Sequence, residues 1–330
     1  MFAFSEIVGH EEIKSHLEEA IKKKNPFHAY IFDGDVGVGK ETMAKTFAAG
    51  LLCQDSHGHD KPCKECISCR QVESMSSPDV IWVTRAKTDY GVDEIREQVI
   101  GTVDIRPYSA PYKVYIIPEA ERLREESQNA LLKTLEEPPE YAVFILLTSN
   151  ISELLPTVLS RCLVMEFHPL STGTVEEFLI TQCQTPDYIA KESAAFAQGN
   201  IGKAIRYADA SDEFVSRKNK ILEVLKNVDR LDVVDMVESA MSLGAKKEEL
   251  RDYIDLMMLW YRDVLIFKAT KNINQLIFQN ESQAIAYEAQ HRSYEKIEEI
   301  IQGFDKAKVR IKANVNVEVT MELMFATMKE

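Results

Sequence analysis

The segment GDVGVGK at residues 34–40 restricts the possible folds of this chain more than any other feature. It matches the first seven positions of the pattern G-x-x-x-x-G-K-[ST], follows an apolar run at 29–32 and precedes a helix expected at 40–53. In such a strand–loop–helix unit, glycines let backbone N–H groups close around a phosphate, and the helix N-terminus adds a favourable field. The segment therefore predicts a phosphate loop within an α/β domain.

The rest of the first ~165 residues alternates apolar runs of strand length with helical segments. We expect further strands at 80–83, 114–117, 143–148 and 163–167, and helices at 11–24, 92–103 and 127–135. Strands separated by helices imply a parallel sheet that is covered on both faces. After Pro169 the pattern becomes helical, with Gly199 and Asn200 marking a break between helices. The predicted domains are an α/β domain at 1–167, a small helical domain at 168–211 and a helical domain at 212–330.

The phosphate loop departs from its pattern at the position that should hold Mg²⁺. That position needs a hydroxyl group and carries Glu41, while Thr42 points roughly 100° away around the helix. A carboxylate about 5 Å from phosphate oxygens would cost roughly 3 kcal/mol at an effective dielectric constant of 20. Alternatively, Glu41 could bind Mg²⁺ itself. The candidate nucleotide-binding residues are Gly34, Gly37, Gly39, Lys40, Glu41 and Thr42.

The strand expected at 114–117 also lacks a metal-binding acid. A metal-dependent ATPase would end this strand in Asp-Glu, and here Pro118 and Glu119 follow it. Proline cannot hold a metal ion or its water, although Glu119 keeps the position of a base that polarises water. The two losses predict that the chain does not itself hydrolyse ATP, whereas binding of ATP or ADP to the degenerate loop stays open.

Four cysteines form a cluster with the spacing C-x9-C-x2-C-x2-C. The first residues show no basic segment followed by an apolar one, and no run reaches the ~20 apolar residues that a membrane span needs. We therefore expect no secretory signal and a chain that is in the cytoplasm and not in a membrane. In that compartment such a cluster favours a metal ion over disulfides. Four soft ligands suit tetrahedral Zn²⁺, which would also order a loop too small to form a core. The predicted structural zinc ligands are Cys53, Cys63, Cys66 and Cys69; free or redox-active thiols are the alternative.

The net charge of −14 makes the chain a poor stand-alone nucleic-acid binder. Neutralising DNA phosphates requires clustered Lys and Arg side chains, which an acidic chain of this composition would have to obtain from partners. A zinc-dependent DNA-binding module remains an alternative only if a basic stripe exists on the surface.

Two further motifs, together with the cysteine insertion, resemble one protein family. The run NALLKTLEEPP at 129–139 and the run LSRC at 159–162 are typical of the bacterial DNA polymerase III clamp loader, a family of AAA+ proteins. The resemblance covers essentially the whole chain. It implies an α/β P-loop AAA+ domain with a zinc module at about 53–70, a small helical lid domain and an all-α C-terminal collar domain.

Two subunit types of this family share these motifs, the tau/gamma motor and the delta-prime subunit. A motor would keep the P-loop hydroxyl, the Asp-Glu pair and a basic sensor residue in the second domain. Here the sensor position falls on Gly202, with Lys203 next to it. The departures favour the delta-prime type. Residues 148–150, Thr-Ser-Asn, stand where the family places its first sensor, although they could also be simple capping residues.

The resemblance assigns the catalytic contribution to Arg161. In the family, the arginine of the Ser-Arg-Cys motif reaches the ATP of a neighbouring subunit, and such a trans arginine finger is worth about 10³–10⁵ in rate. The expected function is a non-hydrolysing subunit that joins tau/gamma and delta subunits and helps load the sliding clamp onto primed DNA. A catalytically active tau/gamma-type ATPase is the alternative, if Glu41 can replace the missing hydroxyl.

Overall fold

The computed structural model describes residues 3–55, 61–242, 247–313 and 315–329. The chain divides into two compact units, one formed by Met1–Ala190 with Ala197–Ile205 and the other by Lys191–Phe196 with Arg206–Glu330. We describe each unit separately. The division into three domains stays a prediction.

The first unit is built on a five-stranded parallel sheet with the strand order β2-β3-β4-β1-β5. Each strand coincides with an apolar run of the sequence, and the central strands are buried along almost their whole length, as expected when helices cover both faces of a parallel sheet. The parallel sheet predicted from the sequence is therefore confirmed. The strands are β1 (Ala29–Asp33), β2 (Val80–Trp82), β3 (Lys113–Ile117), β4 (Ala142–Thr148) and β5 (Leu163–Glu166).

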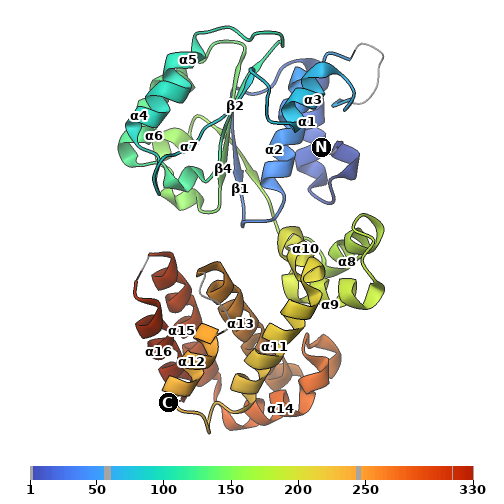
Figure 1. Cartoon of the computed structure of the whole chain (residues 1–330), viewed down its shortest axis with the longest axis vertical. Helices are drawn as coiled ribbons and strands as arrows, with labels where there is room; N and C mark the ends of the chain where they lie inside the picture. The colour runs from blue at the N-terminus through green and yellow to red at the C-terminus, as the bar shows by residue number, and fades with distance from the viewer. Residues whose placement is uncertain (1–2, 56–60, 243–246, 314, 330) are drawn as a thin grey trace. The chain divides into compact units, whose positions relative to one another are not determined.

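Helices pack on the two faces of this sheet and form two separate cores (Figure 1). One face is covered by α1 (Glu11–Lys23), α2 (Lys40–Leu52) and α3 (Ile67–Glu73), with Leu17 and Phe47 fully buried. The other is covered by α4 (Val92–Ile95), α5 (Gly101–Val103), α6 (Glu125–Glu136) and α7 (Pro156–Leu159). The helix expected at 92–103 is continuous but contains a π-helical stretch, Arg96–Ile100, between α4 and α5.

The parallel register brings several loops to one edge of the sheet. Asp33 at the end of β1 lies opposite Thr148 at the end of β4. Asp33 directly precedes the phosphate loop, and Thr148 begins the segment 148–150. In sheets of this kind, ligands bind outside the carboxyl ends of the strands. The phosphate loop, Glu119 and residues 148–150 therefore lie at the edge where a ligand site is expected.

Three short helices follow the sheet: α8 (Thr172–Thr181), α9 (Asp187–Ala197) and α10 (Ile201–Asp209). The break between α9 and α10 is at Gly199, which has a left-handed φ of +82°. A side chain at this position would place its Cβ 2.2 Å from the carbonyl oxygen of Leu170. Glycine is therefore required here both by the backbone angle and by the close approach of residue 170.

The second unit is helical, as expected. Its longest helix, α13, carries the fully buried Trp260 and Tyr261, and Phe304 of α15 packs against Tyr261 with 5.7 Å between ring centroids. Among the described residues, none of the helices has the length and apolar character needed to cross a membrane. The helices are α11 (Ser211–Lys226), α12 (Val233–Ser242), α13 (Lys247–Thr270), α14 (Ser282–His291), α15 (Tyr294–Lys312) and α16 (Val317–Lys329).

Candidate functional site

The phosphate loop connects β1 to α2, and its carbonyl oxygens bind the side chain of Lys40. Gly37 and Gly39 have left-handed φ angles of +92° and +104°, which give the loop its turn. Lys40 is 9% exposed, and its ammonium group donates hydrogen bonds to the carbonyl oxygens of Gly34 and, at 2.8 Å, Asp35. The carbonyl oxygens of the loop thus accept the hydrogen bonds that the Lys40 ammonium group would otherwise donate to a phosphate.

The segment 199–203 packs directly against the outer side of this loop. The Asn200 amide donates to the carbonyl oxygen of Val36 at 2.8 Å, and the Gly202 N–H donates to that of Gly37 at 2.9 Å. A Cβ at residue 202 would lie 2.8 Å from the Gly37 Cα, so no side chain fits there. The position at which the sequence resemblance predicts a basic sensor is thus occupied by a backbone contact.

The two residues after Lys40 do not restore the missing hydroxyl. The carboxylate of Glu41 pairs with Lys45 one turn along α2, at 2.9 Å, and that pair is partly exposed. Thr42 is one residue farther along the helix and half-buried. The alternative in which Glu41 binds Mg²⁺ would require this ion pair to open.

Acidic side chains surround Lys40. Burial lowers the pKa of Lys40, and Glu121, Asp35 and Asp33 oppose that shift by their negative charge. Burial raises the pKa of Asp33. Lys40 thus lies in the field of three carboxyl groups, which favour its charged form.

Glu119 and Glu121 both follow β3 but have different partners. Glu119 has a left-handed φ of +45° and pairs with Arg85 at 2.6 Å. Glu121 accepts hydrogen bonds from the Ser149 N–H at 3.2 Å and the Ser149 hydroxyl at 2.5 Å. Burial alone would raise the pKa of Glu121, but these hydrogen bonds outweigh it and hold the pKa below its usual value. Sequence reasoning selected Glu119 and missed Glu121, which links the loop after β3 to the candidate sensor residue.

The structure brings the sulfur atoms of all four cysteines in the cluster within 4.8 Å of one another. The Cys63 and Cys69 sulfurs are 4.0 Å apart, and a ZnS₄ tetrahedron with bonds of about 2.3 Å has edges of about 3.8 Å. Cys53 and Cys69 are buried, and burial raises the pKa of both thiols, so a thiolate at either position needs a positive partner. The four cysteines could therefore bind a metal ion, and their geometry fits zinc.

The cluster is attached to the helix that begins at the phosphate loop. Cys53 is the C-cap residue of α2, Cys66 caps the N-terminus of α3, and the Cys69 sulfur contacts the carbonyl oxygen of Ala49 at 3.9 Å. Residues 56–60 of the predicted zinc module lie outside the described residues. A metal ion here would hold α3 against α2.

Arg161 follows α7 and is held by three acceptors on its own chain. One terminal nitrogen donates to the Thr157 carbonyl oxygen at 2.7 Å and to the Ser160 hydroxyl at 3.1 Å, and the other forms a short ion pair with Glu136. Its side chain remains 31% exposed. The guanidinium group is thus fixed at the surface and still reachable by a second molecule.

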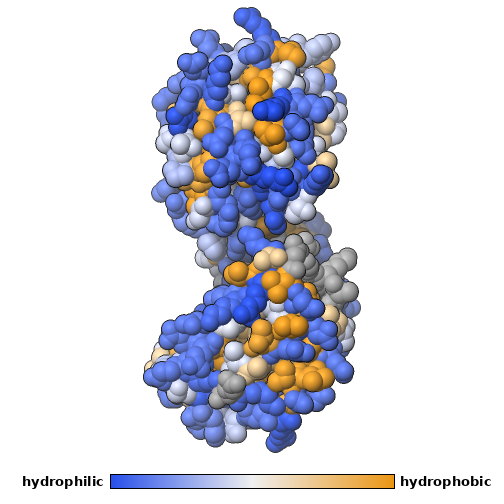
Figure 2. All heavy atoms as spheres, turned by 90° about the vertical axis from the view of Figure 1, so that its left-hand side faces the viewer, coloured by the Kyte–Doolittle hydropathy of each residue, from blue (hydrophilic) through white to orange (hydrophobic). Residues whose placement is uncertain are grey.

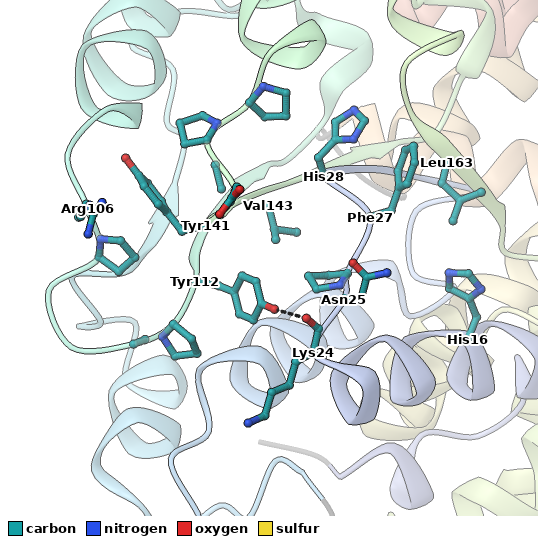
Figure 3. A pocket seen from close by; sticks show the side chains of 18 residues that line it. His16, Lys24, Asn25, Phe27, His28, Arg106, Tyr112, Tyr141, Val143 and Leu163 are labelled. Atoms are coloured by element: carbon teal, nitrogen blue, oxygen red, sulfur yellow. Dashed lines mark hydrogen bonds between the residues drawn. The ribbon is translucent and has the colours of Figure 1, made fainter.

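A cavity of about 1080 Å³ lies at the opposite, amino-terminal ends of the strands (Figure 3). It is lined by aromatic, proline and basic side chains, including Phe27, Tyr112 and Arg106, and the Tyr112 hydroxyl donates to the Lys24 carbonyl oxygen at 2.8 Å. Pro138 and Pro139, which follow α6, also line it. None of the predicted site residues is among the described residues that line this cavity.

The known proteins that this chain resembles in sequence include several subunits of DNA polymerase III. The family model described as "DNA polymerase III, delta subunit" matches residues 9–171. The tau subunit of DNA polymerase III from Bacillus subtilis is 31% identical over 83% of this chain and 52% of its own length. The delta-prime subunit from the same organism is 29% identical over 95% of this chain and 94% of its own. A tau/gamma subunit from Haemophilus influenzae is 38% identical over 62% of this chain and 30% of its own.

The chain therefore spans about half or less of these tau-type relatives and nearly all of the delta-prime relative. Among solved structures, a DNA polymerase III gamma subunit-related protein from Thermotoga maritima aligns over 96% of this chain and 98% of its own, with 16% identity and a TM-score of 0.49.

Proposed function

Since the chain belongs to the clamp-loader subunits of the DNA polymerase III family, we propose that it is a non-hydrolysing subunit of the delta-prime type. The observation that carries the proposal is the contact between the phosphate loop and the segment 199–203, where Gly202 lies against Gly37. A motor subunit needs this space for a basic side chain that senses the nucleotide. Similarity to a delta-prime subunit over nearly the whole of both chains also supports this assignment.

In this role the chain would act on ATP that a neighbouring subunit binds. Arg161 would supply the guanidinium group, because it is held at the surface and keeps part of its side chain exposed. A positive charge introduced from a neighbour stabilises the charge that develops on the transferred phosphoryl group. The chain's own loop would then serve as a structural element, with ATP or ADP binding optional.

The helical unit offers apolar surface for assembly. Val309 of α15 and Val319 and Leu323 of α16 are exposed, at 67%, 47% and 49%. Figure 2 shows hydrophobic side chains gathered on the helical unit. Exposed apolar side chains that gather in this way typically mark contacts with other proteins. We assign this surface to contacts with tau/gamma and delta subunits in a helical collar.

The chain would meet the sliding clamp and primed DNA through the assembled complex, in the cytoplasm. Its net charge of −14 does not favour direct binding to DNA, because affinity for phosphates depends on Lys and Arg. The metal ion of the cysteine cluster would be a structural Zn²⁺ that supplies order to residues 53–70 and takes no part in catalysis.

ATP turnover of the isolated chain tests this proposal. We expect turnover at background level, and a rise in the clamp- and DNA-stimulated ATPase of a tau/gamma–delta mixture when the chain is added. A tau/gamma-type ATPase is the second candidate, because such subunits are among the relatives. Robust turnover by the isolated chain that Lys40→Ala abolishes would establish that second candidate and exclude a non-hydrolysing subunit.

A further inference from the structure

The ion pair between Arg161 and Glu136 joins two segments that the sequence separates by 25 residues. Glu136 is the last residue of α6, and its side chain is 47% exposed. The geometry points to Glu136 as a positioning residue, which fixes the guanidinium group of Arg161 so that its remaining donors face a neighbouring subunit's triphosphate. This inference rests on the proposed role of Arg161.

Helix stability does not account for a carboxylate at this position. The C-terminal end of a helix carries a partial negative charge, so an acidic side chain in the last turn is unfavourable for the helix itself. Glu136 is in that turn and is followed by Glu137, Pro138 and Pro139. Among the described residues, the ion pair with Arg161 is the favourable interaction of the Glu136 side chain.

The contacts of Arg161 leave the donors that a phosphate would need. A guanidinium group carries five N–H donors in a rigid fork. The hydrogen bonds to Thr157, Ser160 and Glu136 use three of them, all on the two terminal nitrogens. Within the described part of the chain, two donors thus remain available, one of them on Nε. Because the other three are fixed, the plane of the fork is set before a ligand arrives.

Such preorganisation affects the rate and not the binding of ATP. A free arginine side chain samples many rotamers, and an exposed ion pair by itself is weak. Three acceptors acting together restrict the guanidinium group to one orientation, which lowers the reorganisation needed when charge develops on the phosphoryl group. Removing the carboxylate should therefore lower kcat for the ATP site that faces this chain and leave KM nearly unchanged.

A double-mutant cycle in the reconstituted complex tests the inference. We expect Glu136→Ala to lower kcat at the facing site about tenfold, by analogy with the effect of removing outer-shell partners that orient metal ligands. Glu136→Gln should restore most of the lost rate, because its amide oxygen still accepts the hydrogen bond. In the Arg161→Ala background, Glu136→Ala should have no further effect. Glu137→Ala, which removes the same charge one residue away, is the matched control and should leave the rate unchanged.

The outcomes separate this inference from the proposed function. If Arg161→Ala lowers the rate and Glu136→Ala does not, the positioning role is wrong and the trans arginine stands. If Glu136→Ala lowers the rate equally with and without Arg161, its effect is structural and the inference is overturned. If Arg161→Ala itself changes nothing, both the trans arginine and the inference fail. Thermal unfolding of each variant should show that Glu136→Ala leaves the folded chain as stable as before.

Discussion

Replacing Cys69 by serine is expected to abolish metal binding by the cysteine cluster and to lower the free energy of unfolding by at least about 4 kcal/mol, since loss of a structural metal is among the few changes with effects of this size. Cys69 is fully buried and contacts α2 through Ala49, so the loss should extend beyond the insertion to the helix that begins at the phosphate loop. Zinc content by elemental mass spectrometry and urea unfolding of the full chain would measure both effects.

Cys183→Ser is the matched control for this prediction. Cys183 is exposed and lies outside the cluster, so the same substitution should change the stability by no more than about 0.5 kcal/mol and leave the metal content intact. Treatment of the unsubstituted chain with a chelator should reproduce the loss seen for Cys69→Ser. A purified chain that holds no metal and is as stable as the serine variant would show that the four thiols have no structural metal.

Arg161→Ala is expected to lower kcat by about 10³ at the ATP site that this chain faces, the lower end of the range for an arginine finger. In a complex with several motor sites, the total ATPase rate should fall by at least the fraction of that rate which this one site contributes. Arg161→Lys should not rescue the rate, because an ammonium group cannot reproduce the planar fork that contacts Thr157, Ser160 and Glu136. Steady-state ATPase of the reconstituted complex with clamp and primed DNA would measure the effect.

The control for this prediction is Arg96→Ala. Arg96 is an exposed arginine of the same unit whose nearest acidic partner, Asp93, is 3.9 Å away on the same helical segment. Its removal should leave the ATPase rate of the complex within a factor of about two, because an exposed ion pair of this kind contributes little to the stability of the chain. Equal losses for Arg96→Ala and Arg161→Ala would indicate a general charge effect and not a trans arginine.

The elements of the α/β unit were predictable because their signals are local. An apolar run such as 143–148 becomes a buried strand whichever segments surround it, and the glycines of the phosphate loop specify a turn between strand and helix. The cysteine cluster was predictable for the same reason, since C-x2-C spacing alone brings two thiols within reach of one ion. The structure shifts the ends of these elements by one or two residues.

The partners of the candidate site were not predictable, because they come from segments distant in sequence. Asn200 reaches Val36 across 164 residues, and Ser149 reaches Glu121 across 28. The resemblance includes Asn200 in the segment 199–203 but places the sensor at residue 202, and Glu121 belongs to no motif identified in the sequence. Gly199 and Asn200 were interpreted as a helix break, which is correct for Gly199 but gives no hint that the neighbouring amide contacts the phosphate loop.

The partner of Glu136 was likewise not predictable from the sequence. It belongs to the run at 129–139 on which the family resemblance depends, yet no sequence pattern connects it to Arg161. Only the packing of α6 beside α7 brings the two together. Motifs therefore identified which segments matter, and the fold was needed to show which side chains act as a pair.

The ATPase rate of the reconstituted complex that carries Lys40→Ala in this chain alone tests the central claim most directly. The Lys40 ammonium group donates hydrogen bonds to carbonyl oxygens of its own loop. The central claim is that this loop takes no part in ATP hydrolysis. We predict a clamp- and DNA-stimulated rate that is indistinguishable from that of the unsubstituted complex, under conditions in which Arg161→Ala lowers it. A loss of rate with Lys40→Ala as large as that with Arg161→Ala, in a complex that still assembles, would contradict the account, because it would show that the phosphate loop of this chain takes part in hydrolysis by the complex.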